Sequence, residues 1–313
     1  MPVKDAQGLT VVTLCRNNPD QLDLTLTSIS RQTSSPSRVI VVDGSDASSR
    51  PESESIAQKH GAQYLYQNPS GVYAAMNRAL ANVKPSESVL FLNSGDWFAS
   101  PKSVEIINNV LSGDPGSSWL VGDTLTVGPN GHKIGTRHRL PLPTRWALRV
   151  RDFWFPHPST IYRASALKEL GGFVTRFVIA ADYFMSLKLF DNYGPPRIIP
   201  IVLSVHHLDG LSTEHPYSGP IERAKSRIRI YGLVQIFIEP GLLLIRFFRE
   251  VRQVFLGHLR RVFVNGRVRN LTIDRLDTDH FCPQPGQKFW PDCCIDVLRG
   301  EVAPRKDGER LAD

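Results

Sequence analysis

Two glycine-rich phosphate-binding motifs are missing from this sequence. Neither G-x-G-x-x-G nor G-x-x-x-x-G-K-[ST] occurs anywhere in its 313 residues. The first motif binds dinucleotides in Rossmann-type oxidoreductases, and the second cradles phosphates in P-loop enzymes. Their absence removes the main sequence support for both of these enzyme classes.

Cysteines and long apolar runs are also scarce. The four cysteines, Cys15, Cys282, Cys293 and Cys294, form neither a dense disulfide framework nor a paired Cys-x-x-Cys zinc pattern, which favours a reducing compartment. The N-terminus lacks the basic-then-apolar layout of a signal peptide, and no segment reaches the roughly 18 uninterrupted apolar residues of a membrane-spanning helix. We therefore expect a cytoplasmic protein.

The composition is that of a globular protein, since 41% of the residues are hydrophobic and 21% are charged. Apolar runs and helical patterns alternate along the first part of the chain, as in a doubly wound α/β sheet. The predicted strands are Leu9–Cys15, Arg38–Asp43, Ala62–Tyr66, Ser88–Leu92, Trp119–Val121, Pro156–Arg163 and Arg197–Val205. The predicted helices are Pro19–Arg31, Glu52–His60, Gly71–Val83 with Ser70 as its cap, Pro101–Leu111 and Asp182–Asp191. A hairpin is expected around Asn130 and Gly131.

Polar residues follow three of the predicted strands directly. They are Cys15–Asn17, Asp43–Asp46 and Asn93–Asp96. If these strands are parallel neighbours, the three tips share the carboxyl edge of the sheet, where ligands of open α/β folds bind. Each tip alone reads equally well as a turn or a helix cap, but three in register favour a site. Its carboxylates suit a diphosphate held through a divalent cation.

Six motifs carry a family resemblance. They are TVVTLCRN, VVDGSD, SGVYAAMNRAL, FLNSGDWF, AADYFM and HLDGLST, in this order. Over about Leu9 to Thr213 the chain resembles family 2 glycosyltransferases, especially those of colanic-acid and other exopolysaccharide biosynthesis. The resemblance implies a GT-A fold, which is a Rossmann-like, mainly parallel sheet with helices on both faces, and here also a C-terminal helical appendage. It implies inverting transfer from a nucleotide-sugar donor to a lipid-linked or oligosaccharide acceptor in surface polysaccharide assembly.

The resemblance also assigns residues to the donor. Thr13, Arg16 and Asn17 match the first-strand motif beside the nucleotide, and Asp43, assisted by Asp46, matches the aspartate that contacts the base or ribose. Ser70, Gly71 and Asn77 match a helix start that meets donor hydroxyls or phosphate. Tyr73 and Met76 of the same motif are interpreted as core residues.

FLNSGDWF stands where the family has its D-x-D segment. Asn93 and Gly95 replace the two aspartates, and Asp96 remains as the metal-binding candidate. The resemblance implies Mg²⁺ or Mn²⁺ acting as a Lewis acid on the leaving nucleoside diphosphate.

Asp182 in AADYFM matches the acidic residue that acts as general base. It would take the proton of the acceptor hydroxyl as that oxygen attacks C1 of the sugar opposite the diphosphate, which inverts the anomeric configuration. The alternative is that Asp182 only caps its helix. His157 lies in HPSTIYR, similar to the acceptor-side strand, and His206 and His207 begin a loop similar to one that covers the donor. All three are candidate loop contacts; His206 or His207 is interpreted as a ligand of the metal or a contact of the diphosphate, or else as a structural histidine.

Acidic residues are scarce between Arg223 and Arg269, where arginine is dense. In Tyr231–Val264 apolar clusters alternate with arginines, as in a helix that lies on an anionic membrane surface. The alternative is a helical pair that packs its apolar face on the catalytic domain, with its arginines in water. A lipid-linked acceptor would explain peripheral contact with the inner face of the plasma membrane. Nucleic acid is not expected, because no binding motif is present.

These patterns divide the chain into a GT-A catalytic domain at 1–217, a basic amphipathic helical segment at 218–269 and a tail at 270–313. Two other functions are alternatives to a glycosyltransferase. A sugar-phosphate nucleotidylyltransferase would need a glycine-rich, basic first-strand loop, which LCRNNPDQ does not supply. A degenerate scaffold that binds a sugar nucleotide without turnover would explain the missing D-x-D aspartates.

Overall fold

The protein is described by a computed structural model that covers residues 8–128, 133–137, 142–150, 153, 155–207, 218–244 and 248. The strands are β1 (Leu9–Cys15), β2 (Arg38–Asp43), β3 (Gln63–Tyr66), β4 (Ser88–Phe91), β5 (Trp97–Phe98), β6 (Trp119–Val127), β7 (Lys133–Arg137), β8 (Thr160–Arg163) and β9 (Arg197–His207). The helices are α1 (Pro19–Ser30), α2 (Arg50–Lys59), α3 (Val72–Ala81), α4 (Ser103–Gly113), α5 (Arg145–Val150), α6 (Ala164–Glu169), α7 (Ala181–Tyr193) and α9 (Ser218–Tyr231), with a 3-10 turn η1 (His157–Ser159).

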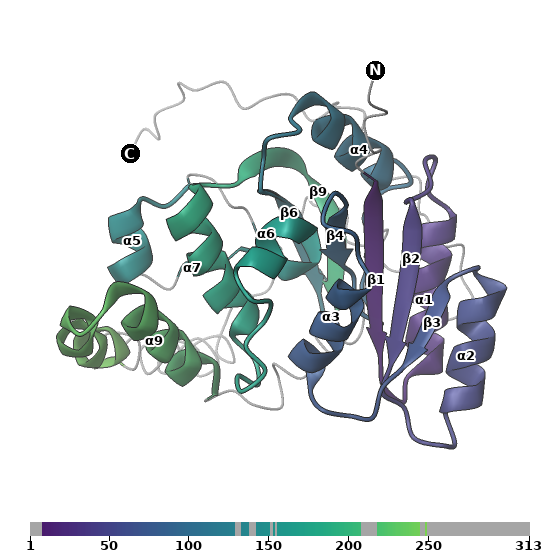
Figure 1. The fold of residues 1–313 in the computed structure, drawn as a ribbon, viewed down its shortest axis with the longest axis horizontal. Helices are drawn as coiled ribbons and strands as arrows, with labels where there is room; N and C mark the ends of the chain where they lie inside the picture. Colours follow the sequence, from purple (N-terminus) through teal and green to yellow (C-terminus); the bar gives the residue numbers. More distant parts are fainter. Residues whose placement is uncertain are drawn as a thin grey trace, which may run out of the picture.

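One sheet runs through the molecule in the order β3-β2-β1-β4-β8-β6-β9-β5, and β7 pairs with β6 (Figure 1). Strands β3, β2, β1 and β4 are parallel, as the alternation of strands and helices predicts. Beyond β4 the sheet is mixed, because β8 runs antiparallel to both β4 and β6. Every residue of β1 and β4 is buried, which agrees with their nearly continuous apolar sequences and with helices on both faces.

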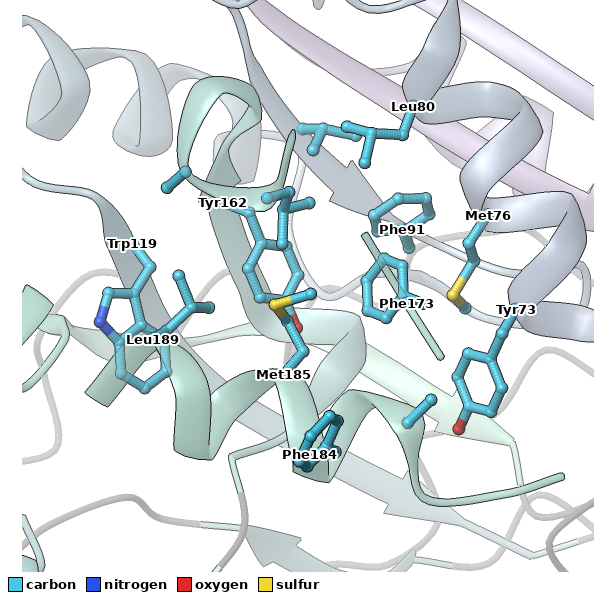
Figure 2. Packing of buried hydrophobic residues seen from close by; sticks show 14 of the residues in the cluster. Tyr73, Met76, Leu80, Phe91, Trp119, Tyr162, Phe173, Phe184, Met185 and Leu189 are labelled. Carbon is cyan, nitrogen blue, oxygen red and sulfur yellow. The ribbon is translucent and has the colours of Figure 1, made fainter. Parts of the chain in front are cut away.

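Helices cover the two faces of the sheet in two groups. Side chains of β1 alternate, so Val12 and Leu14 pack with α3, α6 and α7, while Leu9 and Val11 pack with α1, α2 and α4. On the first face Phe91 packs edge to face with Phe173, and Tyr73 of α3 stacks on the same ring (Figure 2). This aromatic cluster joins α3 to the segment before α7.

Several predicted boundaries are wrong. Ser70 does not cap α3: the N-cap position is Gly71, whose φ of 98° favours glycine, and the Ser70 hydroxyl instead accepts a hydrogen bond from Gln67. The predicted strand at Pro156–Arg163 begins with the turn η1 and is extended only from Thr160. The strand predicted to end at Val121 continues to Val127.

The predicted hairpin after Asp123 is confirmed by the antiparallel pairing of β6 and β7. Its turn residues, Asn130 and Gly131, lie outside the described residues. Three short elements, β5, α5 and α6, are absent from the elements that the sequence predicts.

The C-terminal helices pack on α7 through a buried polar network. Arg227 of α9 forms an ion pair with Glu239, with 2.6 Å between Nε and Oε1, and its Nη1 donates to the Tyr183 hydroxyl at 3.1 Å. Gln235 donates to Glu239 Oε1 at 2.8 Å. Residues 234–244 are helical.

The described helices of this segment therefore pack on the catalytic domain, but through polar side chains, with Arg227 buried and with Leu233 and Phe237 exposed. The packing alternative is wrong in that respect, and the boundaries of the predicted 218–269 segment stay a prediction. Arg246, Arg249, Arg252, Arg260, Arg261 and the tail at 270–313 lie outside the described residues. Within the part of the chain that the structure describes, no helix combines the length and apolar character needed to cross a bilayer.

Candidate active site

The three polar strand tips lie at one edge of the sheet, as the sequence predicts. β2, β1 and β4 are adjacent and parallel, and Cys15 at the end of β1 is in register with Asp43 at the end of β2. The amide of Ser94, just past β4, donates to the Leu14 carbonyl at 3.0 Å, which ties the third tip to the first. This edge is the carboxyl edge of the parallel half.

Asp43 is the buried centre of the second tip. Its Oδ1 accepts hydrogen bonds from the Ser45 amide at 2.8 Å and the Ser45 hydroxyl at 2.5 Å, and its Oδ2 accepts one from the Tyr64 hydroxyl at 2.7 Å. Burial and this carboxylate raise the pKa of Tyr64. Asp43 therefore holds the tip in shape, and a contact to the base or ribose stays a prediction.

The first two tips are linked by Asn17, the one non-glycine residue with positive φ among those described. The Asn17 amide donates to Ser45 Oγ at 2.8 Å, and its Oδ1 accepts from the Asp46 amide at 3.0 Å. Asp46 in turn accepts hydrogen bonds from Ser48 and Ser49 before α2, and the bond from the Ser48 hydroxyl is the main cause of its lowered pKa. The Arg16 side chain beside them is exposed.

Two donor candidates have buried oxygens without a hydrogen-bond partner among the described residues. They are Thr13 Oγ1 on β1 and Asn93 Oδ1 after β4. Asn77 differs from them, because its side chain makes two hydrogen bonds to the Phe173 backbone, each at 2.8 Å. Oδ1 accepts from the Phe173 amide, and Nδ2 donates to the Phe173 carbonyl. Thr13 and Asn93 thus keep acceptors for a ligand, while Asn77 joins α3 to the segment after α6.

The stretch Asn93–Asp96 is a tight turn built on Gly95. The Asp96 amide donates to the Asn93 carbonyl at 2.9 Å, and Gly95 has φ of 94°, as the third residue of a type II turn requires. Thr25 of α1 fixes the turn, since its hydroxyl donates to the Asp96 carbonyl at 2.7 Å and accepts from the Gly95 amide at 3.0 Å. The turn therefore places the Asp96 side chain against β9, where it bonds His206 and His207.

Asp96 meets the two predicted loop histidines there. Its Oδ1 accepts hydrogen bonds from His206 Nδ1 at 2.9 Å and from the His207 amide at 3.1 Å. The Asp96 side chain is 6% exposed and that of His206 is 30% exposed. The sequence placed these residues 110 positions apart in two separate motifs, and the fold brings them into contact.

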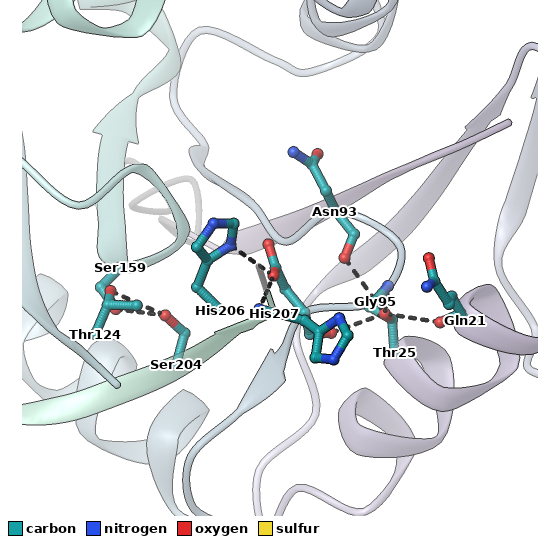
Figure 3. A network of polar contacts seen from close by, with 10 residues as sticks. Gln21, Thr25, Asn93, Gly95, Thr124, Ser159, Ser204, His206 and His207 are labelled. Carbon is teal, nitrogen blue, oxygen red and sulfur yellow. Dashed lines mark hydrogen bonds and ion pairs between the residues drawn. The ribbon is translucent and has the colours of Figure 1, made fainter. Parts of the chain in front are cut away.

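Three buried hydroxyls hold β9 beside η1. Ser159 Oγ lies 2.7 Å from Thr124 Oγ1 and 2.6 Å from Ser204 Oγ (Figure 3). Ser159 also donates to the Asp123 carbonyl at 2.7 Å. The cluster sets the position of His157 in η1 relative to His206 in β9.

Asp182 lies in the first turn of α7, and the N-cap position is Ala180. Asp182 is therefore not the N-cap residue of α7, and the capping alternative is wrong. Asp182 Oδ1 lies 3.1 Å from the Tyr73 hydroxyl, which also donates to the Ile179 carbonyl. Burial and the Asp182 charge raise the pKa of Tyr73, so this phenol stays protonated and positions the carboxylate.

The charges of both Asp182 and Asp96 act on the His157 side chain. Its ring stacks on Phe91, its Nδ1 lies 3.0 Å from the Tyr162 hydroxyl, and its Nε2 is buried without a partner among the described residues. Burial lowers its pKa, and the charges of Asp182 and Asp96 oppose that shift only in part. The imidazole is thus neutral near neutral pH.

This lowered pKa predicts a pH dependence of stability. Below about pH 6.5 the unfolded chain protonates this histidine while the folded protein does not, so the free energy of unfolding falls as the pH drops, by up to about 1.4 kcal/mol per pH unit. Denaturant unfolding of wild type and His157→Phe between pH 7 and pH 5 measures it. The variant is expected to show the shallower slope, and equal slopes would contradict the prediction.

A protein-only metal cage is absent from the described residues, where no group of three His, Cys, Asp or Glu side chains could hold an ion. Asp96, Asn93 Oδ1 and His206 are the available ligands. One carboxylate and one amide oxygen suit a hard cation that takes its remaining ligands from phosphate and water.

The sequence does not reveal the roles of three residues that shape the site. Tyr73 was interpreted as core, which its burial bears out, but its hydroxyl also meets Asp182. Thr25 carries no motif signal. Glu222 of α9 accepts hydrogen bonds from the backbone just before Asp182, and the only hint in the sequence is that it is the one acid in the otherwise basic stretch Ser218–Tyr231.

The model of the family described as Glycosyl transferase family 2 matches residues 10–171. The chain is 24% identical over 170 residues to the O-antigen chain rhamnosyltransferase WbaN of Salmonella anatum, which is 51% of this chain and 53% of that protein. It is 28% identical over 187 residues to an uncharacterized glycosyltransferase of Mycobacterium tuberculosis strain H37Rv, which is 58% of this chain and 69% of the relative. The match thus spans only about half the length of the rhamnosyltransferase.

Solved structures show the same fold at low identity. The crystal structure of S. aureus TarS 1-349 in complex with UDP-GlcNAc has a TM-score of 0.54 and 18% identity, covering 73% of this chain and 66% of that one. A crystal structure of a mycobacterial protein has a TM-score of 0.53 and 20% identity, covering 72% and 76%. These likenesses and the family match confirm the GT-A fold that the sequence predicts.

Proposed function

This chain belongs to glycosyl transferase family 2, and from that premise we propose that it moves a sugar from a nucleoside diphosphate to a hydroxyl of a saccharide acceptor with inversion. The observation that carries the proposal is that two carboxylates from different parts of the chain both act through their charge on His157. Asp96 lies at the strand-tip edge with His206, and Asp182 lies at the start of α7 with Tyr73. One carboxylate on the donor side and one on the acceptor side are what this chemistry requires.

In the proposed step Asp182 accepts the proton of the acceptor hydroxyl. The freed oxygen pair forms the new bond to C1 of the sugar, and the bond from C1 to the diphosphate oxygen breaks on the opposite face, so that the nucleoside diphosphate leaves with that electron pair. The residues proposed to bind the donor are Thr13, Arg16, Asn17, Asp43, Asp46, Ser70, Gly71, Asn77 and Asn93. The unpartnered oxygens of Thr13 and Asn93 support this assignment best.

A divalent cation, Mg²⁺ or Mn²⁺, is proposed as the cofactor. Asp96, with Asn93 Oδ1 and His206, would hold it, and when bound it would offset negative charge on the leaving diphosphate. The fit rests on the orphaned Asn93 oxygen and on the position of Asp96 Oδ2, which accepts no hydrogen bond from a described residue. His207 and His157 are proposed as the neighbours that keep Asp96 and the acceptor side in place.

The proposed acceptor is a lipid-linked or oligosaccharide chain in surface polysaccharide assembly. The rhamnosyltransferase relative, named for O-antigen chain synthesis, supports this class. Peripheral contact with the cytoplasmic face of an anionic membrane is proposed to bring the enzyme to that acceptor.

An unusual helix supports the membrane contact. Leu233, Phe237 and Leu244 are 76%, 86% and 55% exposed. At about 100° per residue they fall within about 40° of one another around a helix axis. Gln235 and Glu239 on the other side are 1% and 3% exposed. Among the described residues this helix buries its polar side and exposes its apolar side, and an anionic bilayer suits such a side and the arginines that follow it in the sequence.

Flotation with lipid vesicles tests this contact. The wild-type chain is expected to float with vesicles containing anionic phospholipid, less so with neutral ones, and Phe237→Glu to lose most of the binding. Gln63→Glu adds the same charge to an exposed residue of β3 and is expected to float like wild type. Wild type that stays unbound on both vesicle types would contradict the proposal.

The function itself is tested by nucleoside diphosphate release from UDP-, GDP- and dTDP-sugars, with and without Mn²⁺, in the presence of extracted lipid-linked glycans. Release from one donor class that depends on the glycan extract supports a transferase and names its donor. The alternative is a scaffold that binds a sugar nucleotide, which the loss of the D-x-D aspartates favours. It predicts binding without release under conditions that support a control transferase.

A further inference from the structure

Glu222 makes an arrangement that neither the family motifs nor the proposed reaction uses. It lies on α9, is 7% exposed, and accepts hydrogen bonds from three consecutive backbone amides of another segment. The Val178 amide donates to Oε1 at 2.7 Å, and the Ile179 and Ala180 amides donate to Oε2, each at 2.9 Å. Such charge-assisted bonds are stronger than bonds between neutral groups.

These amides belong to the residues immediately before α7. The first amides of a helix have no partner within the helix, and a side chain at the N-cap usually accepts one of them. Here the N-cap is Ala180, which has no side chain that could do so. Glu222 accepts the amide of Ala180 together with the two amides before it, and it places a negative charge near the positive end of the α7 dipole.

The same segment is held from its other side by Tyr73. Its hydroxyl donates to the Ile179 carbonyl and lies 3.1 Å from Asp182 Oδ1. The peptide groups around Ile179 are therefore bound by Glu222 through N–H and by Tyr73 through C=O. Asp182 lies only two residues after Ala180, the last residue of this doubly bound segment. The position of Asp182 therefore depends on how the segment is held.

We propose that Glu222 is a positioning residue for Asp182, an inference that rests on the proposed role of Asp182 as general base. The Glu222 carboxylate fixes residues 178–180 so that the Asp182 carboxylate meets the acceptor hydroxyl in line with the donor. Arg227 of the same helix forms an ion pair with Glu239 of the following helix. Both C-terminal helices therefore help to hold Glu222 in place and, through it, Asp182. Without them the catalytic domain would bind donor but transfer poorly.

Glu222→Gln in the full chain tests the inference. The amide keeps one acceptor oxygen and turns an NH₂ donor toward backbone N–H groups, which displaces the segment. We expect kcat to fall about 10- to 100-fold, the order that a small misplacement of a catalytic group costs, with the donor KM within about twofold of wild type. Glu87→Gln is the matched control. Glu87 lies just before β4, and its carboxylate also accepts hydrogen bonds from a backbone amide, that of Lys84, and from the Arg38 side chain. The kcat of Glu87→Gln should stay at the wild-type value.

A double variant separates positioning from general stability. If Glu222 acts through Asp182, adding Glu222→Gln to Asp182→Asn lowers kcat no further. Multiplied losses, or wild-type kcat in a folded Glu222→Gln, would overturn the inference. Should Glu222→Gln fail to fold, Glu222→Asp, which keeps the charge at shorter reach, is expected to lower kcat with donor KM unchanged, and wild-type kcat there would count against it.

Hydrogen exchange distinguishes this inference from the proposed function. Amides 178–180 should lose protection in Glu222→Gln and keep it in Glu87→Gln. Absence of sugar transfer by the wild type would overturn the proposed function and, with it, the link to catalysis. Equal protection of these amides in wild type and Glu222→Gln would overturn the inference even when transfer is observed.

Discussion

Asp182→Asn is expected to lower kcat for sugar transfer by about 10²- to 10⁴-fold, the usual contribution of a general base. The substitution keeps the size of the side chain and an oxygen that can still accept from the Tyr73 hydroxyl. It removes the capacity to take the acceptor proton. Donor binding, measured as the Kd of the nucleoside diphosphate, should change less than about threefold, because no proposed donor contact is touched.

Asp191→Asn is the matched control for this variant. Asp191 lies on the same helix, and its Oδ1 pairs with Arg145 at 2.9 Å on an exposed face. Its loss is expected to leave kcat unchanged, since exposed ion pairs contribute little. A kcat of Asp182→Asn within threefold of wild type would remove Asp182 from the reaction and leave Tyr73 and Glu222 as supports of the helix alone.

The carboxyl edge of the sheet could be predicted from the sequence because local signals coincide there. Continuous apolar runs require strands buried on both faces, and each run ends in polar turn residues such as Asp43 and Asn93. Parallel neighbours must then place these tips together. The contacts at the tips are confirmed, whereas the donor roles of Asp43 and Asp46 stay predictions.

Other parts of the site depend on contacts that no local pattern encodes. Asp96 and His206 lie in separate motifs, and only the pairing of β5 with β9 brings them together. Ser70 is not the N-cap of α3, because Gly71 occupies that position with a φ of 98°, which glycine adopts readily. Burial alone predicted Tyr73 as core, and periodicity does not reveal that its hydroxyl reaches Asp182.

Asp96→Asn should reduce kcat/KM about 100-fold, equivalent to about 2.7 kcal/mol of transition-state stabilisation. The amide oxygen can still accept from His206 Nδ1 and the His207 amide, so the geometry is kept and only the charge is lost. Asp96→Ala removes these acceptors as well and leaves the half-buried His207 amide without this partner, which costs about 1 kcal/mol of unfolding free energy. Comparing the two variants separates the charge from the scaffold role of this carboxylate.

The Mn²⁺ dependence of nucleoside diphosphate release decides what that charge does. If Asp96 holds the cation, Asp96→Asn should need more Mn²⁺ for half-maximal release, because one carboxylate is a large share of the negative charge that the protein offers a hard cation here. Asp114→Asn, which loses a carboxylate that meets Ser117 and Arg197 away from the strand tips, should respond to Mn²⁺ like wild type. An unchanged Mn²⁺ response in Asp96→Asn with full kcat/KM would mean that Asp96 only orders β9 and its histidines. The diphosphate charge would then have to be offset by cationic side chains, and Arg16, exposed at the first strand tip, would be the first to test.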